Sequence, residues 1–308
     1  MKVKSVLLFL VLFVHMLYAQ TSKNSFTNLP EIDLWGKNIP DGSGPENGIK
    51  ISATGSVTNV SVPKLLVGIP ENPNGVGILI ISGGGYAHIE IGKESHPAAL
   101  WLQSLGITTF ELEYRLPQEN WKTTLVPFQD AQRAMRIIRS KAVEYHLNPD
   151  KIGILGFSAG GHLAGYTSSA FETPLYPLQD TIDMISARPD FCGLIYPVIS
   201  MLPPNNKTHS FKSILGKNPS AESEIKFSVE HLVTNKTPVT FIAQAKDDPV
   251  SPIDNSLLMF NALKSHAVPV EIHIFQTGGH GWGLGKPGTD TQEWPKLFEA
   301  WLKNNHIF

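Results

Sequence analysis

The feature that most constrains this chain is a series of short apolar segments that alternate with segments of helical periodicity. The apolar segments are hydrophobic nearly throughout, as strands covered on both faces must be. They lie at 64–69, 77–82, 108–114, 152–157, 191–199, 239–245 and 270–275. The helical segments lie at 96–105, 128–146, 252–266 and 292–304. This alternation predicts an α/β fold, a doubly wound and mostly parallel sheet with helices on both faces.

Composition excludes several classes of partner and site. The net charge is −2, and no long run of Lys or Arg occurs, so we expect neither nucleic acid nor an anionic membrane surface as the main partner. The one cysteine, Cys192, lies in an apolar stretch and has no second thiol to pair with, so we expect it in the core. No spacing of Cys and His suggests zinc, so no metal is expected.

The N-terminal segment has the pattern of a secretory signal peptide. Lys2 and Lys4 precede an apolar run that ends near Ala19 and is too short to span a bilayer. We therefore expect a signal at 1–19 and a secreted or periplasmic protein, with an uncleaved anchor as the alternative. Residues 20–308 are expected to form one domain, in which 20–62 is an extended lead-in. The irregular stretches 171–189 and 201–237 are expected to form a lid or pocket wall.

A serine between glycines is the strongest chemical signal. Residues 156–160 read Gly-Phe-Ser-Ala-Gly, follow an apolar strand and precede a helical segment. This is the setting of the nucleophile elbow, in which a tight turn exposes a serine hydroxyl above the sheet. The alternative is an ordinary strand-to-helix connection with small residues for close packing. The strand before the motif and the helix after it favour Ser158 as a nucleophile.

A serine nucleophile needs a base, and the base needs a carboxylate. Among eleven histidines, His280 lies in a glycine-rich loop directly after the last predicted strand. Asp247 and Asp248 follow strand 239–245, and either could serve the histidine because Ser251 can cap the next helix. The alternative is that both aspartates only form the turn. The chain order serine, aspartate, histidine is that of α/β-hydrolases.

A triple glycine, 83–85, follows strand 77–82 and predicts an oxyanion hole. Glycines let backbone N–H groups approach a developing oxyanion closely. A phosphate-binding loop is the rival interpretation, but Gly92-Lys93 is followed by Glu94 and not by Ser or Thr. His88 and His96 could line the same site. His162, one helical turn after the serine, could brace it.

The motifs SGGGYAHI, IGILGFSAGGHLA, AKDDPVSP and GGHGWGLG together resemble the α/β-hydrolase superfamily. The chain is most similar to secreted bacterial esterases of the acetylxylan esterase and BD-FAE group, over roughly residues 60–305. The resemblance implies Ser158 as nucleophile, His280 as base and Asp247 as acid. Asp247 is implied because the family's acid stands three residues before a valine, here Val250.

The resemblance also implies where the oxyanion is bound. Its donors fall on the N–H groups of Gly84, Gly85 and Ala159. Ser82 departs from the pattern, because lipase-like relatives carry His at this position. No cofactor is implied.

The expected function is that of a secreted serine esterase that hydrolyses short O-acyl esters, chiefly acetyl esters, on carbohydrates. We expect Tyr86, Phe157 and Trp282 to bind substrate, either by limiting the acyl pocket or by stacking on a sugar ring. The polar stretch 205–209 suits a hydrated carbohydrate. The alternatives are a peptidase of the prolyl-oligopeptidase type and an inactive hydrolase fold that binds sugar. The sequence leaves open which ester and sugar are recognised and whether the protein is an oligomer.

Overall fold

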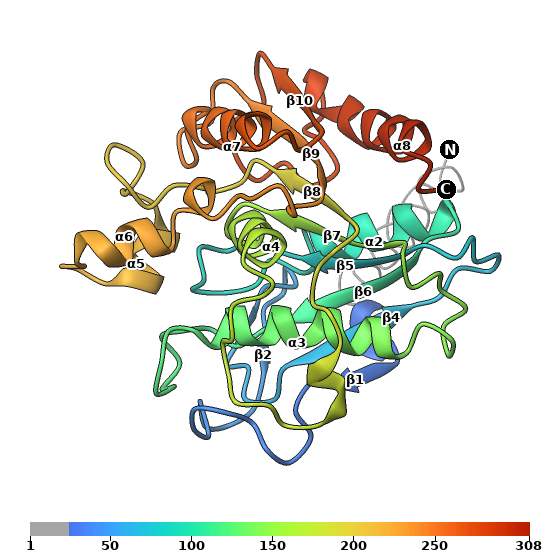
Figure 1. Ribbon diagram of the computed structural model, residues 1–308, viewed down its shortest axis with the longest axis vertical. Coiled ribbons are helices and arrows are strands. Elements are labelled where there is room, and N and C mark those ends of the chain that lie inside the picture. Colours follow the sequence, from blue (N-terminus) through green and yellow to red (C-terminus); the bar gives the residue numbers. More distant parts are fainter. Residues whose placement is uncertain (1–24) are drawn as a thin grey trace, which may run out of the picture.

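The computed structural model describes residues 25–308, in which eight strands form one sheet in the order β1-β4-β6-β5-β7-β8-β9-β10 (Figure 1). The strands are β1 (Glu31–Asp33), β4 (Lys64–Gly68), β5 (Gly77–Ile81), β6 (Thr108–Glu113), β7 (Ile152–Phe157), β8 (Phe191–Ile195), β9 (Val239–Ala245) and β10 (Val270–Phe275). Strands β5 to β10 are parallel to one another, whereas β4 is antiparallel to β6 and β1 is antiparallel to β4. The strands β2 (Lys50–Ile51) and β3 (Val57–Thr58) form a separate hairpin.

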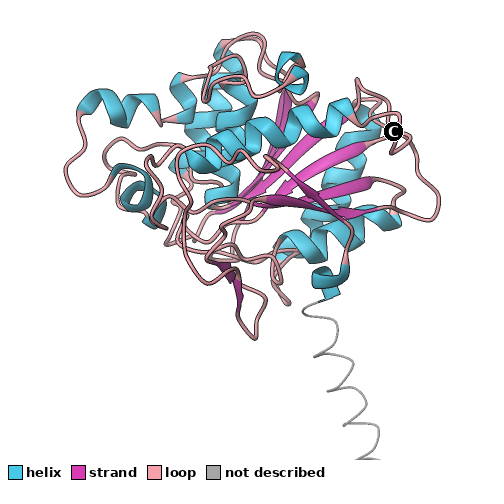
Figure 2. Cartoon of the chain, turned by 90° about the horizontal axis from the view of Figure 1, so that it is seen from below, coloured by secondary structure: helices cyan, strands magenta, loops and turns pink. Residues whose placement is uncertain are grey.

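Helices cover both faces of the sheet (Figure 2). The α-helices are α2 (Ser95–Ser104), α3 (Val126–Ser140), α4 (Ala159–Ser169), α5 (His209–Leu215), α6 (Ala221–Lys226), α7 (Asp254–Ser265) and α8 (Trp294–Asn304). Short 3₁₀-helices lie at Ser25–Asn28, Thr181–Met184, Val229–His231 and Asp290–Glu293. Strand β5 shows the division: Leu79 and Ile81 join the core under α3, α4 and α7, whereas Ile78 and Ile80 join the core under α2 and α8. Both faces of β5 are thus buried, which explains its unbroken apolar sequence.

The predicted doubly wound, mostly parallel sheet is confirmed, with three differences in detail. The expected strand 191–199 ends at Ile195, where Tyr196 takes a φ of 38° and Pro197 has no N–H for the ladder. Strand β1, inside the lead-in, was not predicted, because three residues carry too little periodicity. The irregular stretch 201–237 contains α5 and α6. The expected signal at 1–19 lies outside the described residues.

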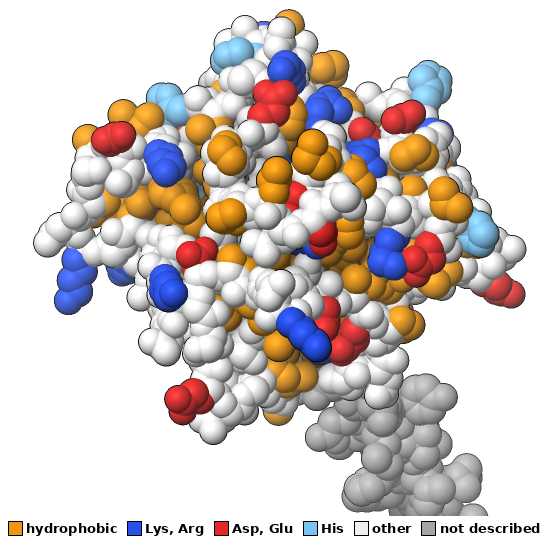
Figure 3. All heavy atoms as spheres, turned by 60° about the horizontal axis from the view of Figure 1, so that its bottom comes forward, with side chains coloured by type: hydrophobic (Ala, Val, Ile, Leu, Met, Phe, Trp, Pro, Cys, Tyr) orange, Lys and Arg blue, Asp and Glu red, His pale blue; other side chains and the backbone are white. Residues whose placement is uncertain are grey.

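The face in Figure 3 carries acidic and basic side chains interspersed with scattered hydrophobic ones. Neither sign of charge gathers there into a broad patch of the kind that binds a polyanion. None of the helices within 25–308 has the length and apolar character needed to cross a bilayer. Cys192 is buried, as predicted, and burial raises the pKa of its thiol to about 12.

The lead-in is attached to the sheet by a buried ion pair. Arg115 and Asp130 have fully buried side chains, and their closest N–O distance is 2.7 Å. Asp130 also accepts a hydrogen bond from the Trp35 indole at 2.7 Å, and Arg115 donates to the carbonyl of Pro40 at 2.7 Å. The pair therefore satisfies two polar groups of the lead-in, the Trp35 indole and the Pro40 carbonyl, at a site where both charged side chains are buried.

Removal of one partner leaves the other charge buried and unpaired. We expect Asp130→Ala to lower the free energy of unfolding by about 3–5 kcal/mol. As a control, Glu299→Ala removes an exposed pair with Lys303 and should cost at most about 1 kcal/mol. Denaturant unfolding followed by circular dichroism measures both, and equal small losses would contradict this account of the lead-in.

Candidate active site

Ser158 lies at the turn between β7 and α4, in a backbone conformation that few side chains adopt. Its φ is 53° and its ψ is −117°. A Cβ on Gly156 would lie 2.2 Å from the carbonyl oxygen of Gly160, and a Cβ on Gly160 would lie 2.2 Å from that of Ile81. Glycine is therefore required on both sides of the serine. The turn has the geometry of the predicted nucleophile elbow.

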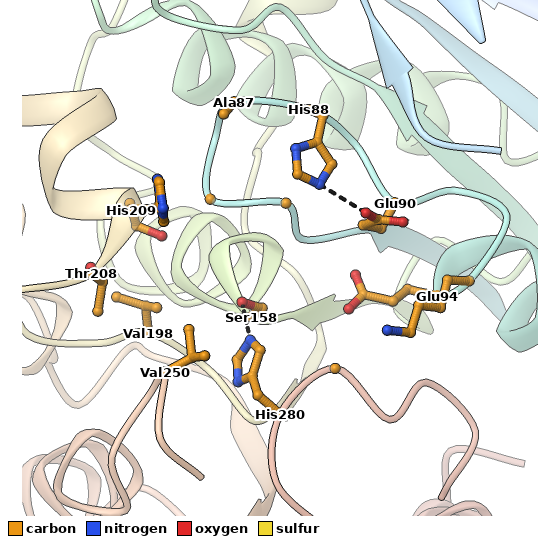
Figure 4. Close-up of a pocket in the computed structure, with 15 residues that line it drawn as sticks. Ala87, His88, Glu90, Glu94, Ser158, Val198, Thr208, His209, Val250 and His280 are labelled. Carbon is orange, nitrogen blue, oxygen red and sulfur yellow. Dashed lines mark hydrogen bonds and ion pairs between the residues drawn. The ribbon is translucent and has the colours of Figure 1, made fainter. Parts of the chain in front are cut away.

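His280 reaches the serine from the loop after β10, as predicted. Its Nε2 lies 2.8 Å from the Ser158 Oγ (Figure 4). The imidazole packs edge-on against the Tyr196 ring, with 5.0 Å between the ring centroids. The serine hydroxyl thus has a base within hydrogen-bond distance, and a packed aromatic ring limits the orientations of that base.

The carboxylate that faces His280 is Asp248 and not Asp247. The His280 Nδ1 lies 2.7 Å from the Asp248 Oδ2, and the Asp248 side chain is fully buried. Its Oδ1 accepts hydrogen bonds from the N–H groups of Val250 and Ser251 at 2.8 and 2.9 Å. Asp247 is exposed, and its Oδ1 accepts a hydrogen bond from the Gly279 N–H at 2.8 Å.

The assignment of Asp247 from the family resemblance is therefore wrong, and the alternative, Asp248, occupies the place. The carboxylate of Asp248 folds back on the next residues in an Asx turn, which directs it inward under the histidine. Counting three residues back from Val250 does not reveal in which direction an aspartate side chain points. The sequence does contain a signal that could have found it. Asp248 stands two residues before Val250, whose N–H is free to donate to the carboxylate, and Ser251 and Pro252 follow.

The glycine loop lies beside the serine and has N–H groups to offer. The N–H of Gly83 donates to the Glu94 Oε2 at 2.6 Å and is not available to a ligand. The N–H groups of Gly84 and Gly85 have no acceptor within residues 25–308. Ala159 is the first residue of α4, where the N–H groups of a helix are unsatisfied. Their predicted role as oxyanion donors fits this arrangement and stays a prediction.

The cavity above Ser158 has a volume of about 460 Å³. Its lining includes Gly84, Gly85, Ala87, His88, Glu90, Lys93, Glu94, Ser158, Val198, Thr208, His209, Val250 and His280. Figure 4 shows His88 and Glu90 on one side of the serine and His209 on the other. Most of the surface that lines the cavity is apolar, although many of the side chains carry a polar group, and the two valines are its largest aliphatic side chains.

The three aromatic residues expected to bind substrate are not in this lining. Tyr86 and Phe157 are fully buried, and Trp282 is 6% exposed. Tyr86 donates to or accepts from the His162 Nδ1 at 2.8 Å, and Phe157 packs between Tyr196 and Trp294. The prediction is wrong because a residue next to a site residue in sequence can direct its side chain into the core.

Two of the remaining histidines support the site without touching the serine. His162 is fully buried between Tyr86 and the carbonyl of Phe227, and burial lowers its pKa to about 4. It is therefore a neutral brace, as the sequence suggested. His88 lines the cavity and lies 2.8 Å from Glu90, which raises the pKa of the imidazole. His96 is buried against Glu111, outside the cavity lining.

Glu94 is a site residue that the sequence analysis considered only as evidence against a phosphate loop. Its buried carboxylate accepts hydrogen bonds from the Gly83 N–H at 2.6 Å and the Tyr196 hydroxyl at 2.9 Å. That hydroxyl also accepts from the Gly283 N–H at 3.0 Å. Burial raises the pKa of Glu94 above its usual value, although both hydrogen bonds lower it. Glu94 thus joins the glycine loop to the loop that carries His280.

Across residues 25–308, no three His, Cys, Asp or Glu side chains are grouped so that they could hold a metal ion.

The sequence pattern of the BD-FAE family matches residues 70–263, well over half of the chain. The chain belongs to the BD-FAE family. The family is one of α/β-hydrolases related to acetylxylan esterases, so the predicted membership is confirmed. The matched residues include Ser158 and Asp248 and end before His280.

Two relatives of this BD-FAE protein carry names that refer to xylan. An acetylxylan esterase of Xylanibacter ruminicola is 33% identical over 221 residues, which are 70% of this chain and 43% of that protein. Endo-1,4-beta-xylanase B of Butyrivibrio fibrisolvens is 36% identical over 207 residues, which are 66% of this chain and 32% of that protein. The chain thus spans less than half the length of either relative.

Solved structures agree on the fold. An acetyl ester-xyloside bifunctional hydrolase from Caldicellulosiruptor lactoaceticus is 36% identical, with a TM-score of 0.78 over 91% of this chain and 97% of that chain. The carboxylesterase Cest-2923 from Lactobacillus plantarum is 22% identical, with a TM-score of 0.67 over 85% of this chain and 99% of that chain. The latter similarity establishes the α/β-hydrolase fold alone.

The two neighbouring aspartates of the BD-FAE site allow a matched test. We expect Asp248→Asn to lower kcat on p-nitrophenyl acetate by about 10⁴-fold, because the amide cannot hold the His280 tautomer or stabilise its cation. Asp247→Asn keeps an oxygen that can accept from the Gly279 N–H, and its loss should stay below about tenfold. A larger loss in Asp247→Asn than in Asp248→Asn would reverse the assignment.

Because the Glu94 carboxylate joins the glycine loop to Tyr196, we expect substitutions of Glu94 to change kcat more than KM. Glu94→Ala releases the glycine loop, and a displacement of about 1 Å at the reacting groups costs on the order of 10²-fold. Because the Glu94 pKa is raised, its carboxylate is protonated as the pH falls through a higher range than for an exposed Glu. Glu94→Gln lacks this titration, so the acid limb of its kcat profile should be shallower. Unchanged kcat values and unchanged acid limbs in both variants would show that Glu94 is merely structural.

Proposed function

We propose that this protein is a serine carboxylic-ester hydrolase that removes acetyl groups from carbohydrates. The observation that carries the proposal is the chain of contacts from Ser158 Oγ to His280 Nε2 and from His280 Nδ1 to Asp248, at the base of an open cavity. The glycine loop supplies two N–H groups beside the serine. The names of two relatives, an acetylxylan esterase and an acetyl ester-xyloside hydrolase, support acetyl esters of xylan-type sugars as the substrate class.

The proposed reaction follows from these contacts. The Ser158 Oγ attacks the ester carbonyl carbon while its proton passes to the His280 Nε2. Asp248 accepts the Nδ1–H of the imidazolium and stabilises its charge in a buried site. The carbonyl oxygen becomes an oxyanion that the N–H groups of Ala159 and Gly84 or Gly85 bind. His280 then donates its proton to the leaving sugar oxygen. A water molecule, deprotonated by His280, attacks the acetyl-serine, and His280 returns the proton to the Ser158 Oγ as acetate leaves.

The lining of the cavity favours a short acyl group. Val198 and Val250 are its largest apolar side chains, and the remaining side chains are mostly charged or hydroxylated. A short acyl group needs no larger aliphatic surface than these two valines provide. An alcohol with several hydroxyl groups finds hydrogen-bond partners in His88, Glu90 and Thr208. The small aliphatic side chains and the polar groups of the lining thus fit an acetyl ester of a sugar.

The proposal predicts the order of rates for p-nitrophenyl acetate, butyrate and octanoate at one pH. Acetate should have the highest kcat/KM, because the relatives that support this substrate class are named for acetyl esters. Acetate release from acetylated xylo- and manno-oligosaccharides should accompany it, and Ser158→Ala should abolish both activities. An optimum on octanoate would indicate a lipase. Activity on a peptide amide without acetate release would indicate a peptidase.

A further inference from the structure

A second hollow opens directly beside the catalytic cavity. Six of its lining residues belong to the β2–β3 hairpin and its turn: Lys50, Ile51, Ser52, Thr54, Ser56 and Thr58. The other three, Ala87, His88 and Glu90, also line the catalytic cavity. The two spaces therefore share a wall, and we name the second one the hairpin groove. Its volume is about 590 Å³.

We propose that the hairpin groove holds the sugar units that adjoin the acetylated one, so that the substrate is an oligomeric or polymeric carbohydrate chain. This inference rests on the proposed esterase function. It extends that function from the ester bond to the chain that carries it.

The chemistry of the hairpin groove suits a neutral carbohydrate. Four hydroxyl side chains line it, those of Ser52, Thr54, Ser56 and Thr58. The Ser52 and Thr54 hydroxyls bond to each other at 3.0 Å and the Ser56 hydroxyl bonds to Glu90, so these three keep part of their hydrogen-bonding capacity for a sugar. Ile51 is 37% exposed and offers an apolar surface to the C–H face of a sugar ring. A sugar presents the same mixture of hydroxyl groups and C–H faces.

The groove is anchored to the catalytic loop and does not depend on substrate to form. Val57 and Ile89 exchange two backbone hydrogen bonds of 2.8 Å, and the Gly92 N–H donates to the carbonyl of Gly55 at 3.1 Å. Glu90, at the border of the two spaces, bonds to His88 at 2.8 Å. A wall fixed in this way loses little freedom when a ligand binds.

The direction of the chain follows from the neighbouring cavities. On the other side of Ser158, beyond His209, a hollow lies against α5 and is lined by residues that include Gln118, Lys207 and Lys212. This hollow shares no lining residue with the catalytic cavity. A chain that leaves the site past His88 and Glu90, which line both spaces, next meets the hairpin groove.

The test compares a bulky substitution in each hollow. Thr58→Trp fills the hairpin groove at a strand position that tolerates an aromatic residue. Lys212→Trp adds a similar side chain at an exposed position of α5. Thr58→Val, which removes only the hydroxyl, is a milder variant should Thr58→Trp fold poorly. Each protein is assayed for kcat/KM on three substrates: acetylated xylose, an acetylated xylo-oligosaccharide of six residues, and p-nitrophenyl acetate.

The wild-type enzyme should prefer the six-residue substrate. Thr58→Trp should lower the ratio of kcat/KM on this substrate to that on p-nitrophenyl acetate by about tenfold or more, and Thr58→Val by a smaller factor. Lys212→Trp should leave the ratio unchanged. The inference is overturned if the wild type shows no preference for length, if neither Thr58 variant lowers the ratio, or if only Lys212→Trp does.

Failure of the proposed function has a different signature. In that case, the wild-type protein would cleave p-nitrophenyl acetate yet release no acetate from any acetylated oligosaccharide. Such a result removes the carbohydrate substrate and the groove proposal together. Release of acetate from every chain length at equal kcat/KM would remove the groove proposal alone.

Discussion

The site depends on the close approach of two turns, one after β5 and one after β7. Gly160 lies so near the end of β5 that a Cβ would collide with the Ile81 carbonyl, and Gly83 lies equally near Ser158. Adjacent parallel strands bring these turns to the same edge of the sheet, and the absence of side chains lets them touch. The serine hydroxyl and the free N–H groups of the glycine loop therefore meet in one place. All other parts of the site are built around this contact.

Two buried carboxylates organise the groups around that contact. Asp248 is held by the N–H groups of Val250 and Ser251 and orients the base, whereas Glu94 is held by Gly83 and Tyr196 and orients the glycine loop. A buried carboxylate is costly unless its oxygens are satisfied. Asp248 is satisfied by its own turn and by His280, and Glu94 is satisfied by the glycine loop and by Tyr196. The cost of burial is offset only when those loops are in place, so the site is pre-organised before a substrate enters.

The N-terminal segment contributes both to stability and to the shape of the site. Its first described strand pairs with β4, and Trp35 bonds to the buried Asp130. Further along, the β2–β3 hairpin bonds to the loop that carries His88 and Glu90. A segment that the sequence shows only as polar and irregular thus forms one wall beside the catalytic cavity. This wall is where we place the carbohydrate chain.

The sequence alone determined the sheet and two members of the site. Burial on both faces imposes a continuous apolar pattern, and the elbow imposes Gly156 and Gly160 around Ser158, so both could be predicted. His280 could be found because it follows the last strand in a glycine-rich loop. Tertiary structure alone decided that Asp248 and not Asp247 meets it, that Tyr86 is directed into the core, and that Glu94 joins two loops. In an irregular turn, the direction of a side chain depends on all the hydrogen-bond partners that it can reach, and the partners that are distant in sequence, such as His280 for Asp248 and Tyr196 for Glu94, are brought within reach only by the fold.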